Sequence, residues 1–307
     1  MKLVTFEKNG AQSIGILDGE KIAVLDGAAN PAFASMLALI EGGDEALDAA
    51  RKAQGSASSV DLGAVRLLAP LPVPVQMRDC LTFEKHLRQC RSTMSKIDPN
   101  QRDLEPEDVQ LAQVWYDQPV YYKGNRFSVS GMDDQIIWPK GETRLDYELE
   151  LGMITGKGGM DIRKEDGQDH VFGFLIFNDF SARDHQMLEM GGGLGPAKGK
   201  DWATANAMGP CIVTKDEIGD GSGLEMVARV NGEEWSRGNS STMHHSFGRI
   251  LEHVSRDERV MAGEFFGSGT VGGGCGLEMN RFLEPGDVVE LEIEGIGVLR
   301  NKVGPRQ

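Results

Sequence analysis

The chain has 307 residues and a formal net charge of -15, which is enough length for one large domain with or without a small one. The acidic balance argues against nucleic acid or an anionic membrane as a partner. No apolar run is long enough to span a membrane, the first residues lack the apolar core of a signal peptide, and four scattered cysteines indicate free thiols in a reducing cytoplasm.

The first 70 residues predict a small unit of their own. Short strands and then one or two helices are expected in the order 4–6, 12–17, 21–25 and 33–52. Asp18-Gly19 is a hairpin turn signal between the second and third strands. The prolines of the run 70–74 exclude a regular helix or a central strand. We therefore predict a small N-terminal α/β domain over 1–70 and a larger domain over 71–307.

The segment from Arg78 to about Gln113 predicts interrupted helices. One helix is expected to start in Thr82–Leu87, Asp98-Pro99-Asn100 breaks it, and Glu105–Trp115 predicts another. Residues 87–113 are polar, which favours a surface segment rather than core. We expect this segment to form a lid that covers the pocket.

From Val120 onward, strands joined by glycine turns are expected, ending with 287–293 and 297–301. Forty glycines, about twice the average usage, support a β-rich fold. Residues 145–151 alternate apolar and acidic side chains, which predicts a strand with Glu148 and Glu150 on one face. Residues 174–179 are apolar on both faces, which predicts a buried strand that ends at Asp179.

If Asp179 converges on Glu148 and Glu150, the three carboxylates form an oxygen-rich site for a hard divalent metal, because neighbouring carboxylates repel one another unless a cation lies between them. Two ordinary alternatives stay open. The glutamates could form the solvated face of an antiparallel strand. Asp179 could cap a helix that begins near Ser181.

Several motifs occur in an order that is typical of one family. They are Asp146-Tyr147-Glu148-Leu149-Glu150, Asn178–Asp184, Gly199-Lys200-Asp201-Trp202, Gly267-Ser268-Gly269-Thr270 and Gly286–Val289, with Gly295–Asn301 after it. From about residue 75 to about 303 the chain resembles the fumarylacetoacetate hydrolase family. The resemblance implies a mainly β (α+β) fold, a β-sandwich roll with the site at its mouth, usually as a homodimer. It also implies Mg, Mn or Ca bound by Glu148, Glu150 and Asp179.

The resemblance also implies a general base and its partner. Members that hydrolyse fumarylacetoacetate carry an Asp followed seven residues later by a His, which maps onto Asp79 as a fourth metal ligand and His86 as the base. The intervening residues differ from that branch. The acid that orients the histidine maps onto Glu278. The alternatives are a surface or core histidine beside Phe83 and a solvent-facing glutamate.

Four further residues are expected to contact substrate. Lys200, in its Gly-Lys-Asp-Trp context, and Gln186 would donate to an oxyanion. Tyr122 would hydrogen-bond the substrate, and Thr270 would present its hydroxyl and backbone N–H to a substrate carboxylate. The alternatives are a surface charge for Lys200, strand packing for Tyr122 and a plain glycine-built turn for Thr270.

The expected function is metal-dependent hydrolysis of a carbon–carbon bond in a small anionic 2,4-dioxo acid, of the fumarylacetoacetate, fumarylpyruvate or acylpyruvate type. A decarboxylase of the oxaloacetate type, or an isomerase or hydratase of ring-cleavage products, is the alternative. The His86–Glu278 pair favours hydrolysis, because decarboxylation needs no activated water. A metal-binding scaffold without catalysis is a third reading, which the complete set of expected residues disfavours.

Overall fold

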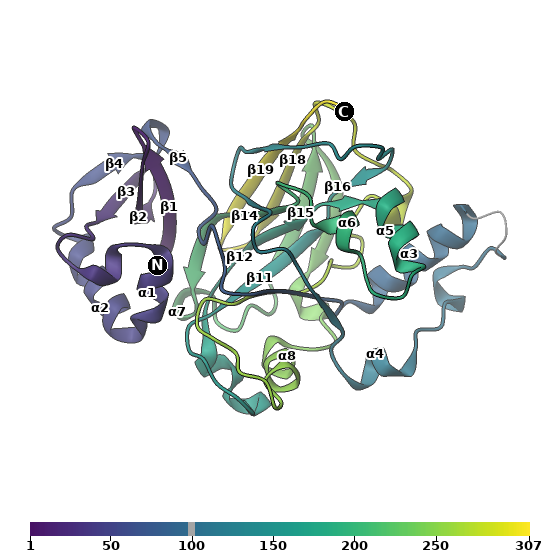
Figure 1. The fold of residues 1–307 in the computed structure, drawn as a ribbon, viewed down its shortest axis with the longest axis horizontal. Helices are drawn as coiled ribbons and strands as arrows, with labels where there is room; N and C mark the ends of the chain where they lie inside the picture. The colour runs from purple at the N-terminus through teal and green to yellow at the C-terminus, as the bar shows by residue number, and fades with distance from the viewer. Residues whose placement is uncertain (98–101) are drawn as a thin grey trace.

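The computed structural model describes residues 1–97 and 102–307 (Figure 1). Its largest element is a 12-stranded mixed sheet. In sheet order its strands are β4 (Ser59–Asp61), β3 (Lys21–Leu25), β2 (Ala11–Asp18), β1 (Lys2–Lys8), β14 (Asn206–Thr214), β12 (Val171–Asp179), β11 (Leu149–Thr155), β17 (Phe265–Gly267), β6 (Met77–Cys80) and β7 (Tyr121–Lys123), with β5 (Arg66–Leu67) beside β1 and β8 (Val129–Ser130) beside β14.

Two smaller sheets and a set of short helices complete the fold. The five-stranded sheet is β16 (Glu233–Asn239), β15 (Glu225–Val230), β18 (Val288–Ile293), β19 (Gly297–Val303) and β9 (Gln135–Ile136), and β10 (Leu145–Asp146) pairs with β13 (Ser181–Ala182). The α-helices are α1 (Met36–Glu41), α2 (Gly43–Gln54), α3 (Glu84–Ile97), α4 (Gln113–Asp117), α5 (Arg183–Met190), α6 (Ala197–Lys200), α7 (Lys215–Ile218) and α8 (Phe247–Val254). Short 3-10 segments are η1 (Pro31–Phe33), η2 (Leu62–Ala64), η3 (Pro106–Asp108), η4 (Lys164–His170), η5 (Ser240–Thr242) and η6 (Leu277–Met279). None of the helices in the described ranges is long and apolar enough to cross a membrane.

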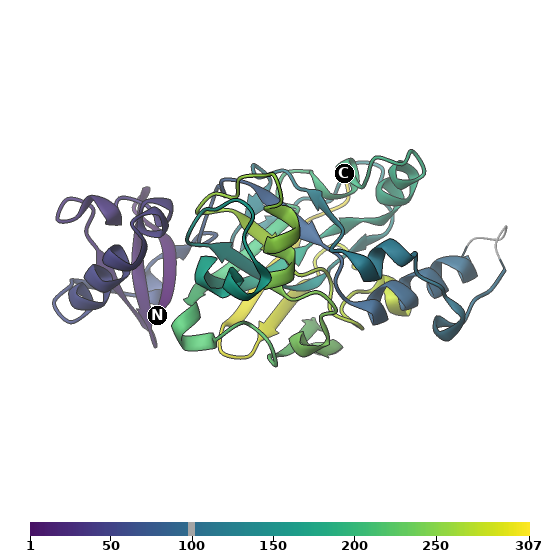
Figure 2. The same cartoon turned by 90° about the horizontal axis from the view of Figure 1, so that it is seen from below.

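The N-terminal strands and helices match the predicted elements, including the turn after Asp18. This unit lies at one end of the molecule, and α3 lies at the other (Figures 1 and 2). Its strands nevertheless continue the large sheet, because Lys2 pairs with Val213 and Leu3 with Ile212 across β1 and β14. The division at residue 70 stays a prediction.

The main core lies between the large sheet and the five-stranded sheet. Every residue of β12 is buried, as its apolar character on both faces predicts. Phe174 and Ile176 of β12 share one apolar cluster with Leu291 and Ile293 of β18. Large apolar side chains from both sheets therefore exclude water between them, and the predicted mainly β (α+β) fold is confirmed.

Two helix predictions were wrong. Residues 77–80 form β6, a buried strand between β17 and β7, because the guanidinium of Arg78 finds Glu264 and Glu258 as partners inside the fold. Most of Glu105–Trp115 is not α-helical: Val109 is buried in an extended conformation, and its carbonyl accepts a hydrogen bond from Arg88. The predicted break at Asp98-Pro99-Asn100 lies outside the described residues.

The prediction of one continuous strand over 145–151 was also wrong. The segment is divided between β10 and β11, and Glu148 lies between them with a single bridge to Cys275. Both faces of β11 are buried, so the solvated-face alternative for Glu150 is excluded. Asp179 is the last residue of β12, and α5 begins only at Arg183, so Asp179 does not cap that helix.

Candidate active site

Three buried carboxylates converge at one end of the large sheet. Asp79 comes from β6, Glu150 from β11 and Asp179 from the end of β12. One oxygen of each lies within 4.8 Å of the others. The central strand β17 joins the first two, since its Gly267 pairs with Asp79 on one side and with Gly152 on the other. Residues separated by a hundred positions are thus brought into one cluster by strand pairing.

The cluster carries more negative charge than its surroundings neutralise. Burial raises the pKa of Asp79, and burial together with the neighbouring carboxylates raises the pKa of Glu150 and Asp179 well above the usual range. Within residues 1–97 and 102–307, Oδ1 of Asp79 and Oδ1 of Asp179 are buried and lack a hydrogen-bond partner. These orphaned oxygens fit a hard divalent cation, which prefers carboxylate ligands.

Glu148 is held at the edge of this cluster by two cations. Its Oε2 lies 2.6 Å from Nζ of Lys200, and its Oε1 lies 2.8 Å from Nη2 of Arg183. Burial alone would raise the pKa of Glu148, but these cations lower it well below its ordinary value. Glu148 is therefore ionised and paired with two cations, whereas Asp179 contacts only Lys200, and Asp79 and Glu150 form no ion pair within the described residues.

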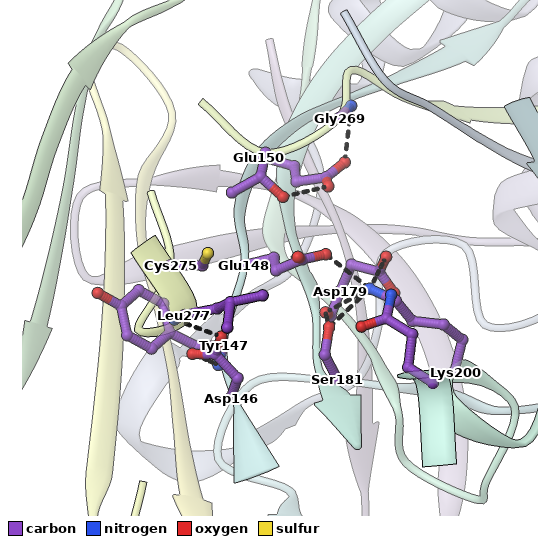
Figure 3. Close-up of polar contacts among 12 residues, drawn as sticks. Asp146, Tyr147, Glu148, Glu150, Asp179, Ser181, Lys200, Gly269, Cys275 and Leu277 are labelled. Carbon is purple, nitrogen blue, oxygen red and sulfur yellow. Dashed lines mark hydrogen bonds and ion pairs between the residues drawn. The ribbon is translucent and has the colours of Figure 1, made fainter. Parts of the chain in front are cut away.

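Lys200 connects the two parts of the site. Its ammonium donates to Asp179 Oδ2 at 2.5 Å and to Ser181 Oγ at 2.7 Å, in addition to Glu148 (Figure 3). Burial alone would lower the pKa of Lys200, but Asp179 and Glu148 raise it, so the side chain keeps its charge. The surface-charge alternative is wrong, because this lysine is buried.

His86 and Glu278 form a buried pair. Nδ1 of His86 lies 2.9 Å from Oε1 of Glu278, and Glu278 also accepts from the backbone N–H groups of Gly273 at 2.6 Å and Gly274 at 3.0 Å. The glutamate side chain is only 2% exposed, which excludes a solvent-facing charge. Burial alone would lower the pKa of His86, but the contacts with Cys275 and with the carboxylate of Glu278 raise it well above the ordinary value.

A cavity of about 360 Å³ is lined by His86 of this pair and by two of the carboxylates, Asp79 and Glu148. Its lining includes Asp79, His86, Tyr122, Glu148, Arg183, Gln186 and Lys200, with Leu87, Cys90, Arg91 and Met94 of α3 and with Met187 and Met190 of α5. A larger groove of about 770 Å³ runs past Lys85, Arg88 and Arg237 on another face of α3, and no carboxylate of the cluster lines it. The smaller cavity is the candidate site because the titratable groups open into it.

Of the remaining predicted substrate contacts, Tyr122 and Gln186 line this cavity and Thr270 does not. The hydroxyl of Tyr122 donates to Asp179 Oδ2 at 2.9 Å, and Oε1 of Gln186 accepts from Arg183 at 2.9 Å. Thr270 is buried and donates to Oε1 of Glu150 at 3.3 Å. The N–H of Gly269 donates to Oε2 of Glu150 at 3.0 Å (Figure 3). Here Thr270 positions a carboxylate.

Two features were missed from the sequence. Asp146 accepts two bonds from Arg183, at 2.9 and 2.6 Å, and it also accepts the backbone N–H groups of Gly276 and Leu277. Its place two residues before Glu148 in the acidic run was the available signal. Cys90 and Cys275 lie beside His86, and their spacing in the sequence gives no such signal.

Comparison with known proteins identifies relatives over the full length. The model of the family described as fumarylacetoacetate (FAA) hydrolase C-terminal matches residues 78–304, and one described as Rv2993c-like, N-terminal, matches residues 1–70. The chain is 32% identical over 322 aligned residues to oxaloacetate tautomerase YisK of Bacillus subtilis (strain 168), covering 99% of this chain and 100% of that protein.

Two solved structures share the fold. Fumarylacetoacetate hydrolase from Exiguobacterium antarcticum has a TM-score of 0.77 and 29% identity, with both chains fully covered. Maleylpyruvate hydrolase from Sphingobium sp. SYK-6, solved in complex with manganese(II) ion and pyruvate, has a TM-score of 0.77 and 21% identity over 100% of both chains, which supports the fold alone.

Proposed function

Because the chain belongs to the fumarylacetoacetate hydrolase family, we propose that it is a tautomerase that interconverts the keto and enol forms of oxaloacetate or of a similar 2-oxo dicarboxylic acid. The full-length similarity to an oxaloacetate tautomerase favours this isomerase chemistry over the carbon–carbon hydrolysis expected from the sequence. The homodimer stays a prediction.

The observation that carries the proposal is the buried contact of 2.9 Å between Nδ1 of His86 and the carboxylate of Glu278, beside the cavity that His86 lines. Tautomerisation moves one proton between a carbon and an oxygen and consumes no water. A histidine whose pKa lies well above its ordinary value holds a proton at neutral pH, which suits donation to carbon. Activation of a water molecule would instead need the neutral imidazole.

Two side chains act on two different atoms of the substrate, His86 on the carbon and Lys200 on the enolate oxygen. Nδ1 of His86 is engaged by Glu278, which leaves Nε2 as the nitrogen that exchanges a proton with the substrate carbon. It donates this proton to carbon in ketonisation, while the enol hydroxyl gives up its own proton to solvent. In enolisation it takes the proton back from carbon, and the oxygen is reprotonated from solvent. On the other side, the ammonium of Lys200 stabilises negative charge on the enolate oxygen.

The carboxylate cluster supplies the metal site of this proposal. Asp79, Glu150 and Asp179, with Glu148 beside them, would hold Mg²⁺ or Mn²⁺, and Ca²⁺ has the same ligand preference. When bound, such an ion supplies Lewis-acid stabilisation of an enolate.

The exposed guanidinium of Arg91 lines the cavity and is suited to the distal carboxylate of a dicarboxylic acid.

The test follows the enol form of oxaloacetate by its ultraviolet absorbance with the Mg²⁺- or Mn²⁺-loaded protein. We expect a His86→Gln variant to lose a factor of about 10²–10⁴ in the rate of enol loss. His244→Gln is the matched control, because that imidazole is exposed, and its rate should equal the wild-type rate.

Hydrolysis is the second candidate, because the His86–Glu278 pair is also the arrangement that activates water. NMR on a panel of oxaloacetate, acylpyruvates and dienoic acids separates the two. Carbon–carbon cleavage of an acylpyruvate with no acceleration of oxaloacetate enol loss would overturn the tautomerase proposal in favour of the hydrolase.

A further inference from the structure

A second group of potential metal ligands lies beside the carboxylate cluster and differs from it in chemistry. One atom each of His86, Cys90, Cys275 and Glu278 lies within 4.8 Å of all the others. The donors are one imidazole nitrogen, two sulfurs and one carboxylate oxygen. This mixed set is typical of sites for Zn²⁺ and differs from the all-oxygen set that Mg²⁺ prefers.

Two short local pairs build this group. His86 and Cys90 are four residues apart on α3, so they lie one above the other on the same face of the helix. Cys275 and Glu278 are three residues apart at η6, which packs against α3. The tertiary contact between α3 and η6 thus brings the two pairs together into one group of four residues.

The distances approach those of a tetrahedral zinc site. With Zn–S of about 2.3 Å and Zn–N or Zn–O of about 2.1 Å, such a site separates two sulfurs by about 3.8 Å, a sulfur from a nitrogen or oxygen by about 3.6 Å, and a nitrogen from an oxygen by about 3.4 Å. The two Sγ atoms lie 3.9 Å apart. Nδ1 of His86 lies 3.7 Å from Sγ of Cys90 and 3.9 Å from Sγ of Cys275, whose Sγ lies 3.6 Å from Oε1 of Glu278.

The remaining measured edge is the hydrogen bond between His86 Nδ1 and Glu278 Oε1 at 2.9 Å. It is about 0.5 Å shorter than the tetrahedral value. A small separation of these two side chains would therefore complete the geometry. His86 and Cys90 line the cavity, so an ion has a route to the group.

We propose that His86, Cys90, Cys275 and Glu278 form a binding site for Zn²⁺ or another soft divalent cation, distinct from the carboxylate cluster. The ordinary alternative is apolar packing, since buried thiols behave as small hydrophobic groups and these two share an apolar cluster with Leu277. The His86–Glu278 hydrogen bond accounts for the nitrogen and the oxygen, whereas metal binding also accounts for the position of both sulfurs within 3.9 Å of Nδ1 of His86.

One consequence rests on the proposed function. The zinc site would use Nδ1 of His86, the atom that contacts Glu278 in the proton-carrying pair. Zinc binding and the pair are then mutually exclusive, and zinc would inhibit the tautomerase. Because binding is measured by spectroscopy, failure of the tautomerase proposal would leave the zinc proposal intact, and the reverse also holds.

The test uses the full chain under reducing conditions with saturating Mg²⁺ and no substrate. Titration with Co²⁺, a coloured substitute for Zn²⁺, should give a thiolate-to-cobalt charge-transfer band that saturates at one ion per chain and disappears when Zn²⁺ is added. In Cys90→Ser and Cys275→Ser the band should be lost or its affinity should fall at least tenfold. Cys211→Ser removes another buried thiol and should leave the band unchanged, as should Glu150→Gln in the carboxylate cluster.

X-ray absorption at the zinc edge of the wild-type protein is a second measurement that does not depend on whether the serine variants fold. We expect two sulfur and two lighter neighbours. A wild-type titration without a charge-transfer band, a band that survives in Cys275→Ser, or a zinc shell made only of oxygen and nitrogen would each overturn the proposal.

Discussion

His86 and Glu278 are 192 positions apart in the chain, and their side chains meet at 2.9 Å. The position of the Glu278 carboxylate is fixed, because two backbone N–H groups of the glycine-rich turn donate hydrogen bonds to it. The imidazole is thereby oriented, and its protonated form is stabilised. The proton-carrying state of the site therefore depends on a residue that does not itself line the cavity.

Replacement of Glu278 by Gln tests this dependence. The amide keeps the size of the side chain but loses its charge, so the pKa of His86 should fall and the enol-loss rate at neutral pH should decrease by about 10²-fold. Steady-state kinetics and the pH titration of the His86 ring by NMR measure the two effects. Glu284→Gln, at an exposed ion pair with Arg306, is the control and should match wild type. A variant with an unchanged His86 titration would contradict the assigned role of the carboxylate.

The pH dependence of ketonisation follows from the raised pKa of His86. The donating form is the imidazolium, which is present below the raised pKa and is lost as the pH rises through it. We therefore expect the enol-to-keto rate to be level across neutral pH and to fall under alkaline conditions. Stopped-flow loss of enol absorbance, measured with the metal-loaded protein, gives the profile. A rate that instead rises with pH through this range would indicate that the neutral imidazole acts as a base.

The strands that could be predicted are those whose own sequences carry the reason for burial. A buried strand was expected over 174–179, which is apolar on both faces, with Asp179 at its end, and the structure has β12 there. Strand β6 was missed because its burial depends on a tertiary partner. Arg78 is a residue that avoids the interior unless it is paired, and Glu264 and Glu258 lie about 180 positions further along the chain.

The residues of the candidate site also divide into those that could be predicted from the sequence and those whose contacts depend on tertiary packing. Glu150 and Asp179 were visible as carboxylates in strand patterns, and the resemblance to a family supplied Asp79, His86 and the other candidates. The sequence could not predict which carboxylates pair with a lysine or arginine of the protein and which do not. Lys200 pairs with Glu148 and Asp179, while Glu150 and Asp79 have no cation of the protein beside them within the described residues. That difference arises from side-chain packing after the strands have paired.

Gly267 offers a test of how tightly the carboxylate cluster is built. A Cβ at this position would lie 2.2 Å from Oδ1 of Asp79 and 2.9 Å from Oε2 of Glu150. Gly267→Ala should therefore displace these carboxylates and weaken Mg²⁺ or Mn²⁺ binding at least tenfold, as measured by calorimetric titration. Gly124→Ala is the matched control, because its nearest atoms lie at an ordinary 3.6 Å. Equal metal affinities in the two variants would contradict a metal site at this cluster.

The buried pair of Asp146 and Arg183 is expected to contribute to stability more than any surface pair. Asp146 is fully buried and accepts two bonds from the guanidinium and three from backbone N–H groups, those of Tyr147, Gly276 and Leu277. Asp146→Asn removes the negative charge and places amide hydrogens against these donors, so it should lower the free energy of unfolding by about 3–5 kcal/mol. Asp133→Asn, at an exposed pair with Arg300, should cost less than about 1 kcal/mol. Urea unfolding of both variants gives the comparison. Similar small losses would mean that Glu148 alone compensates Arg183, since its Oε1 lies 2.8 Å from the same guanidinium.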